Sequence, residues 1–195
     1  MLYIENVRVL LESLAKAAER SALDQQKLIK FIANDIDDEA IEKSPRRIIK
    51  DIIMQLIRNS AVHGIELPET RKAKRKKETG IIRLSIKMSE DKKQIQIIYS
   101  DDGRGLDYKE ISEKALDSKL IAKEDINNTD ALKKAIFMPG FSTSETESLQ
   151  AGRGIGLNLV RDRVKDVNGT IKLRSEDGKG IVFLISIPVD GTWRL

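Results

Sequence analysis

The sequence predicts an α+β fold, a two-layer α/β sandwich in which helices cover one face of a mixed, mostly antiparallel sheet. Segments with a helical spacing of apolar residues occur beside short runs rich in β-branched residues. Two pairs of these runs, 81–88 with 94–100 and 170–175 with 180–188, are separated by a few polar residues. Such short connections join antiparallel neighbours, whereas a parallel sheet needs a long crossover between strands. The 195 residues suit one such domain.

Each predicted element has a local signal in the sequence. Residues 6–21 repeat apolar residues at helical spacing, and residues 27–35 could form a strand. Ser44-Pro45 resembles an N-cap followed by a first-turn proline, which opens a helix over 45–63 that ends at Gly64. Later segments are predicted as helices over 107–120, 129–138 and 157–167, with a flexible stretch rich in Gly, Ser and Thr over 139–156.

The composition excludes several classes of chemistry. The chain has no cysteine, so it has no disulfide, thiolate metal site or cysteine nucleophile. Its one histidine, His63, excludes a multi-histidine zinc or iron site. No apolar run reaches the roughly 18–20 residues that span a bilayer, and the N-terminus lacks a secretion signal. We therefore expect a cytoplasmic protein without a membrane span.

The positive net charge comes from one short run. The chain has 35 basic and 31 acidic residues, and six of the basic ones lie in residues 71–77. Without this run the balance is 29 basic against 31 acidic residues. A run of this kind is most often a solvated loop. Because the chain is poor in aromatic residues, we regard nucleic acid as an unlikely partner.

A row of uncharged polar residues lies along the predicted helix over 45–63. Gln55, Asn59 and His63 recur every four residues, so they share one side of a helix, next to an apolar face. A row at the edge of a core can line a cleft, or it can be an ordinary polar helix edge. The spacing alone favours neither alternative.

Two glycine clusters could bring backbone N–H groups close to a ligand. Asp101-Asp102-Gly103-Arg104-Gly105 directly follows a predicted strand, and a buried aspartate there could accept hydrogen bonds from an exocyclic amine. Gly152-Arg153-Gly154-Ile155-Gly156 opens a predicted helix, where free N–H groups favour phosphate. The second cluster matches neither a Walker loop nor a Rossmann fingerprint. Each cluster taken alone could be a simple turn.

The order of these features is more specific than any one of them. The chain resembles the ATP-binding domain of histidine kinases, in the superfamily of gyrase-type ATPases, Hsp90 chaperones and MutL repair proteins. Within that superfamily it is most similar to the chemotaxis histidine kinases, over residues 25–190. The resemblance rests on the stretches LIRNSAVHGIE (56–66), SDDGRGLD (100–107), IFMPGFSTSE (136–145), GRGIGLNLVRDRV (152–164) and NGTIKLRSEDGKG (168–180).

The resemblance implies a Bergerat-type ATP-binding fold that uses ATP and Mg²⁺. Asn59 resembles the helix asparagine whose side-chain oxygen holds the Mg²⁺, and His63 resembles the family histidine near the phosphates. Asp101 resembles the aspartate that receives the adenine amino group. Gly103 and Gly105 would let the chain turn beneath the base.

The resemblance also implies a mobile lid over residues 137–145 and a set of phosphate-binding N–H groups. Gln55, Asn59 and His63 form the implied catalytic set. The further nucleotide-binding residues are Phe141, Ser142, Thr143, Gly152, Arg153, Gly154, Ile155, Gly156 and Leu157.

Two departures bear on the implied activity. Gln55 stands where the chemotaxis kinases have a histidine and many relatives a glutamate, and an amide cannot act as a general base. His63 lies inside the nucleotide motif, so the phosphoacceptor histidine must lie in another protein or in a part of the chain not present. The resemblance thus implies a histidine-containing acceptor domain and a response regulator as partners. We expect residues 23–195 to form the catalytic domain, and residues 1–22 a helix that either continues a linker or packs on the domain.

Two other functions remain open. A degenerate nucleotide sensor without kinase activity would also fit Gln55. A serine-directed kinase of the anti-sigma type belongs to the same superfamily, although the stretch 136–156 is more similar to the chemotaxis branch.

Overall fold

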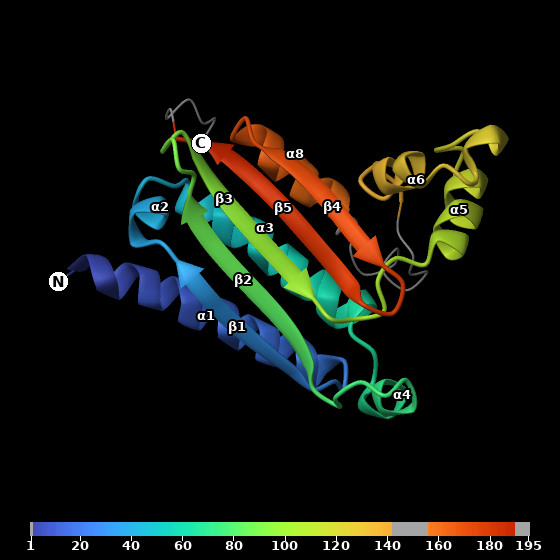
Figure 1. The fold of residues 1–195 in the computed structure, drawn as a ribbon, viewed down its shortest axis with the longest axis horizontal. Helices are drawn as coiled ribbons and strands as arrows, with labels where there is room; N and C mark the ends of the chain where they lie inside the picture. Colours follow the sequence, from blue (N-terminus) through green and yellow to red (C-terminus); the bar gives the residue numbers. More distant parts are fainter. Residues whose placement is uncertain (1, 142–155, 190–195) are drawn as a thin grey trace.

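The computed structural model describes residues 2–141 and 156–189 of the chain. Within these ranges five strands form one sheet with the order β1-β2-β3-β5-β4 (Figure 1). The strands are β1 (Ile29–Ile36), β2 (Gly80–Met88), β3 (Gln94–Asp101), β4 (Thr170–Glu176) and β5 (Gly180–Pro188). β1 pairs with β2 in parallel and every other pair is antiparallel, which confirms the predicted mixed, mostly antiparallel sheet.

The sheet register places Asp101 at the end of a central strand. Asp101 is paired with Ile82 of β2 on one side and with Ile181 of β5 on the other. The neighbouring strands restrain its backbone from both sides, so the following loop leaves the sheet at a defined point.

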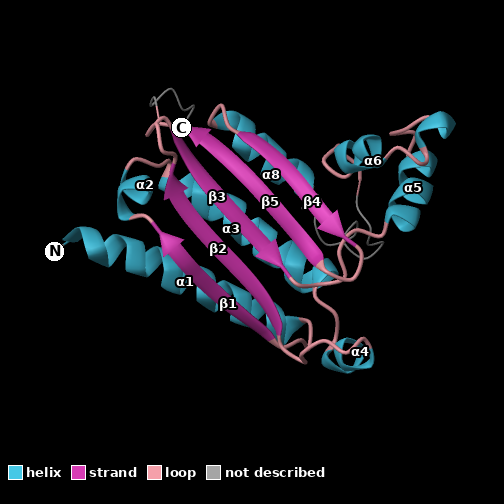
Figure 2. Cartoon of the chain, viewed as in Figure 1, coloured by secondary structure: helices cyan, strands magenta, loops and turns pink. Residues whose placement is uncertain are grey.

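The long helices cover one face of this sheet, as the sequence predicts. Figure 2 shows α1, α3 and α8 behind the strands, with the opposite face of the sheet turned toward the viewer. The helices of this layer are α1 (Leu2–Asp24), α2 (Asp38–Glu42), α3 (Arg46–Asn59) and α8 (Leu157–Asp166). None of the helices in the described ranges is long and apolar enough to cross a membrane.

The main core lies between this helical layer and the sheet. Ile49 and Ile53 of α3 are fully buried, and so are Ile97 and Tyr99 of β3. Leu14 of α1 is buried in the same core, and α1 packs against both α3 and β1. The N-terminal helix therefore packs on the domain, whereas the boundary expected at residue 22 stays a prediction.

A smaller helical unit lies beyond one end of the sheet. It contains α5 (Tyr108–Asp117), the short 3₁₀ helix η2 (Lys123–Asp125) and α6 (Thr129–Ala135), and Figure 1 shows it beside the point where β4 ends. Its own apolar cluster consists of Ile111, Leu132 and Ile136. The side chains of Asp107 and Asn128 cap the first N–H groups of α5 and α6.

Two local predictions were wrong. Ser44 is not the N-cap of α3: the cap position is Pro45, and the Ser44 hydroxyl instead donates to the Ile41 carbonyl, 2.7 Å away, after α2. The run 71–77 is not a simple solvated loop, because it begins inside α4 (Pro68–Ala73) and Arg71 is only 1% exposed. The Ser44 hydroxyl is satisfied locally by the end of α2, which the sequence did not predict, whereas Arg71 is satisfied by Asp102, 31 positions away in the chain.

Candidate active site

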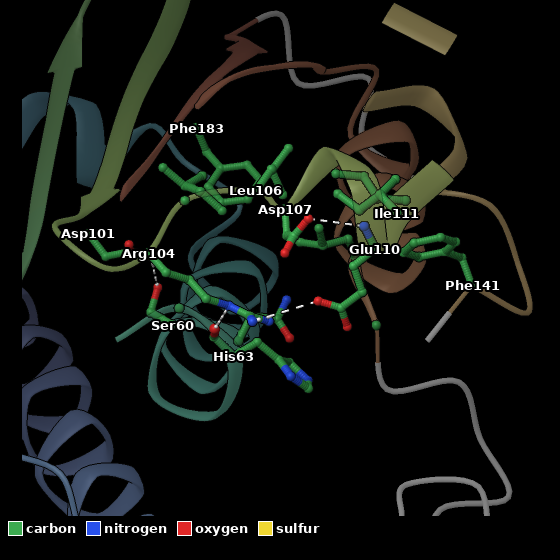
Figure 3. A pocket seen from close by; sticks show the side chains of 17 residues that line it. Ser60, His63, Asp101, Arg104, Leu106, Asp107, Glu110, Ile111, Phe141 and Phe183 are labelled. Carbon is green, nitrogen blue, oxygen red and sulfur yellow. Dashed lines mark hydrogen bonds and ion pairs between the residues drawn. The ribbon is translucent and has the colours of Figure 1, made fainter. Parts of the chain in front are cut away.

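A pocket opens where α3, β3, β5 and the α5–α6 unit meet. It lies at the end of the sheet where β3 ends and β5 begins. Figure 3 shows side chains around it that come from η1, after α3, and from α5 of the smaller helical unit. The lining residues are Asn59, Ser60, His63, Gly64, Asp101, Arg104, Gly105, Leu106, Asp107, Glu110, Ile111, Ile136, Phe141, Gly156, Leu157, Ile181 and Phe183. The pocket thus joins segments that are more than 100 residues apart in the chain.

A π-helical turn, η1 (Ser60–Gly64), follows α3 without a break. Its closing hydrogen bond runs from the Ile65 N–H to the Ser60 carbonyl at 2.7 Å. Ser60, His63 and Gly64 of this turn line the pocket together with Asn59, the last residue of α3. Single π-turns of this kind occur frequently at functional sites.

Gln55 is not among the residues that line this pocket. It lines a separate groove between α1, α3 and α8. Gln55 lies one turn before Asn59 in α3, and its Nε2 donates to Asn59 Oδ1 at 3.4 Å, so the helical row is kept as far as Asn59. Any role for Gln55 toward a phosphate stays a prediction.

Asn59 has an incompletely satisfied amide. Its Oδ1 accepts a long hydrogen bond of 3.4 Å from Gln55 Nε2. Its Nδ2 is buried and has no partner among the described residues. Leaving such a group unpaired costs about 1–3 kcal/mol, so an unpaired amide in a pocket is a candidate ligand-binding group.

Asp101 is held by hydrogen bonds on both carboxylate oxygens. The Ser60 hydroxyl donates to Oδ2 at 2.5 Å, and the Gly103 N–H donates to Oδ1 at 3.0 Å. Behind it, the Tyr99 hydroxyl donates to Ser60 Oγ at 2.9 Å. Burial raises the pKa of Asp101, and the hydrogen bonds from Ser60 and Gly103 offset part of this effect. The result is a buried, oriented hydrogen-bond acceptor.

Two glycines let the loop after β3 approach its neighbours closely. A Cβ on Gly103 would lie 2.3 Å from the Gly64 carbonyl oxygen, so the loop packs directly on the backbone of η1. Gly105 has φ +79°, and a Cβ there would lie 2.5 Å from the Glu176 carbonyl oxygen. The observed contacts are with the protein's own backbone, and the expected place of these glycines beneath a base stays a prediction.

A charged group and a hydroxyl at the site were not singled out from the sequence. The Arg104 Nε donates to the His63 carbonyl at 2.9 Å, and its guanidinium lies 3.7 Å from Glu110. Dashed lines mark these interactions in Figure 3. The hydroxyl is that of Ser60, which accepts a hydrogen bond from Tyr99 and donates one to Asp101. Both residues lie inside the stretches that carry the family resemblance, so their position was the available signal.

The remaining wall of the pocket is apolar. Leu106, Ile111, Phe141 and Phe183 contribute side chains that Figure 3 shows around the opening. A pocket with an apolar wall and a few oriented polar groups suits a flat, partly polar ligand.

The structure brings together most of the site residues predicted from the sequence that it describes. Asn59, His63 and Asp101 line the pocket, and so do Gly105, Phe141, Gly156 and Leu157, whereas Gly103 lies directly beside it. The predictions for Ser142, Thr143, Gly152, Arg153, Gly154 and Ile155, and for residues 142–145 of the expected lid, lie outside the described residues.

The fold and the pocket define a nucleotide-binding domain of the Bergerat type, and a family match supports this class. Residues 45–191 match the family of histidine kinase-, DNA gyrase B- and HSP90-like ATPases. The chain belongs to this family, and within it the chain is similar to chemotaxis-type histidine kinases.

Several curated relatives support the narrower assignment. The chain is 34% identical over 170 residues to the chemotaxis protein CheA of Halobacterium salinarum. The aligned region covers 86% of this chain and 25% of that protein. The chain is 38% identical over 143 residues to CheA of Bacillus subtilis, covering 72% of this chain and 21% of that protein. The chain spans about a quarter of the length of these relatives.

Solved structures show the same fold. The catalytic domain of the histidine kinase ThkA superposes with a TM-score of 0.54 at 19% identity, over 94% of this chain and 92% of that domain. A blue-light activated histidine kinase of Erythrobacter litoralis superposes with a TM-score of 0.51 at 15% identity, over 92% of this chain and 41% of that protein.

Proposed function

We propose that this domain binds ATP with Mg²⁺ and transfers the γ-phosphoryl group to a histidine that lies outside the 195 residues. The observation that carries the proposal is that Asn59, at the end of α3, and Asp101, at the end of β3, line one pocket. An amide and a buried carboxylate at separate points of one cavity can hold the two ends of a purine triphosphate.

The adenine end of the proposed site is built around Asp101. Ser60 and Gly103 already occupy one direction on each carboxylate oxygen, and each oxygen retains further acceptor capacity for the exocyclic amine of adenine. Leu106 and Phe183 supply apolar surface for the ring. A purine with a carbonyl at this position would place oxygen against oxygen, so the carboxylate selects adenine.

The phosphate end of the proposed site is built around Asn59, with His63 and Arg104 nearby. In the described ranges no three carboxylates, histidines or cysteines gather to hold a metal by themselves. The Asn59 amide as a protein oxygen donor fits Mg²⁺, which is commonly bound by one or two protein oxygens together with phosphates and water. The Asn59 amide, with its unpaired Nδ2, can reorient to present its oxygen. Mg²⁺ would supply charge neutralisation on the phosphates.

The acceptor must be presented to this site from elsewhere. His63 is the only histidine of the chain and lines the pocket itself. A histidine-containing domain is therefore the proposed acceptor, with a response regulator as the next carrier. The imidazole of such an acceptor is itself nucleophilic, so transfer does not require Gln55 to act as a base. The cytoplasmic location stays a prediction.

Calorimetric titration with ATP, in the presence and absence of Mg²⁺, tests the nucleotide site. We expect Asp101→Asn to weaken ATP binding about tenfold or more, because the amide turns a donor toward the amine. Asn59→Ala should remove the Mg²⁺-dependent part of the affinity. The exposed residues Asp117 and Asn34 provide the matched controls Asp117→Asn and Asn34→Ala. Unchanged affinity in both site variants would contradict the assignment.

Labelled ATP and a histidine-containing acceptor domain test the transfer. We expect label on the acceptor histidine and none with Asn59→Ala. The alternative that Gln55 suggests, because an amide cannot act as a general base, is a nucleotide sensor without transferase activity. Tight ATP binding with no label on any acceptor would favour the sensor and overturn the kinase proposal. Label on a serine would assign the serine-directed activity instead.

A further inference from the structure

Four charged side chains meet beneath the loop that follows β3, outside the lining of the nucleotide pocket. Arg71 and Glu66 are 1% and 6% exposed at their side chains, and Lys76 is 18% exposed. The fourth member is Asp102, the residue next to Asp101. Such deep burial of charges is costly unless they are paired and hydrogen-bonded, so the cluster needs a structural or functional reason.

Arg71 uses its guanidinium to fix both the side chain and the backbone of Asp102. It donates to Asp102 Oδ2 at 2.9 Å, to the Asp102 carbonyl at 3.2 Å and to Glu66 Oε2 at 3.1 Å. Its Nε donates to the Lys77 carbonyl at 2.7 Å. Asp102 Oδ1 in turn accepts from the Ile81 N–H at 2.8 Å, which ties the loop to β2.

Lys76 bonds two successive carbonyls of the same loop. Its Nζ donates to the Asp102 carbonyl at 2.9 Å and to the Gly103 carbonyl at 2.7 Å. Glu66 accepts from Lys76 at 3.1 Å and supplies the counter-charge. Burial raises the pKa of Glu66, but the hydrogen bonds and charges of Lys76 and Arg71 outweigh it, so the net pKa is lowered. Glu66 therefore stays ionised at neutral pH.

One peptide unit connects this cluster to the proposed adenine site. The carbonyl of Asp102 receives both Arg71 and Lys76, and the N–H of the same peptide belongs to Gly103 and donates to Asp101 Oδ1 at 3.0 Å. Cations on the oxygen of a peptide polarise its N–H and strengthen the hydrogen bond on the other side. The position and orientation of the Asp101 carboxylate thus depend on two buried cations that do not line the pocket.

We propose that Lys76 and Arg71 are positioning residues for adenine selection, which act through the Asp102–Gly103 peptide to hold the Asp101 carboxylate in its base-binding orientation. The proposal rests on the proposed nucleotide site and deepens it. It predicts that loss of a cation lowers the preference for an amino purine over an oxo purine. The contribution of the triphosphate, bound at the other end of the pocket, should be unaffected.

The test compares Lys76→Met with Lys72→Met. Both changes remove one lysine charge from the same basic segment, but the Lys72 side chain is 76% exposed and pairs with the exposed Glu78 at 3.3 Å. Calorimetry gives the affinities for ATP and for inosine triphosphate, whose base carries an oxygen in place of the amine. We expect Lys76→Met to lower the ATP-to-inosine triphosphate affinity ratio about tenfold, as for loss of a charged hydrogen bond, and Lys72→Met to leave it unchanged.

The possible outcomes are distinguishable. A wild-type protein that binds neither nucleotide, or shows no preference, would contradict the proposed site itself. A wild-type preference that Lys76→Met retains would overturn only the positioning role. Lys76→Gln, which keeps a donor, provides a second variant, and it should recover part of the ratio. If both Lys76 variants fail to fold, as judged by circular dichroism, the lysine serves stability rather than base selection, and the proposal is overturned.

Discussion

Replacing Gly103 by alanine tests whether the close packing of the β3 loop on η1 creates the nucleotide site. The added Cβ would lie 2.3 Å from the Gly64 carbonyl oxygen, 2.4 Å from the Gly64 carbonyl carbon and 2.9 Å from the Ile65 nitrogen. Real Cβ atoms essentially never come closer than 3.0 Å to another heavy atom, so the loop must move by at least about 0.7 Å. All three neighbours are backbone atoms and cannot rotate away.

This displacement has two expected effects. Overpacking of this kind costs about 1–3 kcal/mol, and backbone contacts place Gly103→Ala toward the upper end of that range. The same movement pulls the Gly103 N–H from Asp101 Oδ1, now 3.0 Å away. A hydrogen bond to a charged group contributes about 1.5–3 kcal/mol, so ATP affinity should fall at least about tenfold.

Urea unfolding and calorimetric ATP titration measure the two effects separately. Gly178→Ala is the control: Gly178 has φ +72°, but a Cβ added there would have no described atom within 4 Å. Left-handed backbone alone costs an alanine about 1–2 kcal/mol, so this control should lose some stability and keep ATP affinity. If Gly103→Ala were as stable as the wild type and bound ATP equally well, the packing argument would be refuted.

Three further predictions follow from burial and hydrogen bonding. Because burial raises the pKa of Asp101 above that of an exposed aspartate, preference for ATP over inosine triphosphate should be complete at neutral pH and decline as pH falls, beginning at higher pH than for an exposed carboxyl. Calorimetry across pH measures this ratio, in which phosphate titration cancels. Lys27→Met should lower the free energy of unfolding by about 1–3 kcal/mol in a denaturant titration, because the Lys27 ammonium donates to two carbonyls of η1. Lys30 is exposed, so the control Lys30→Met should change this free energy little. Leu14→Ala should lower the free energy of unfolding by about 2–5 kcal/mol, as measured by thermal or urea unfolding. The control Val9→Ala, at an exposed position of the same helix, should lower it by less than about 0.5 kcal/mol. Equal stability of Leu14→Ala and the wild type would show that α1 is dispensable for folding.

The arrangement of helices and strands could be predicted because its signals are local. The short turns after residues 88 and 175 join antiparallel strands, and β2–β3 and β4–β5 form those pairs. The short helices α2 and α4 escaped prediction because five and six residues carry too little periodicity to be recognised. The parallel pairing of β1 with β2 also depends on contacts across a crossover of more than 40 residues.

The candidate site was only partly predictable for a related reason. Asn59, His63 and Asp101 were identified by type and order, and the structure places all three around one pocket. Ser60 and Arg104 were not identified, because their partners lie 39 to 41 positions away in the chain. No local sequence signal shows contacts over such a separation.

The fold class, the family and the identity of Asn59, His63 and Asp101 as site residues were determined by the sequence alone, because periodicity, turn chemistry and motif order are local features of the chain. The tertiary structure alone decided which charges are buried. Arg71 and Lys76 look like a solvated run in sequence, yet they bond the backbone of residues 102 and 103 from about 26 to 31 positions away. The partners of a charged side chain are determined only by the folded chain, which brings them within hydrogen-bond distance and excludes the water between them.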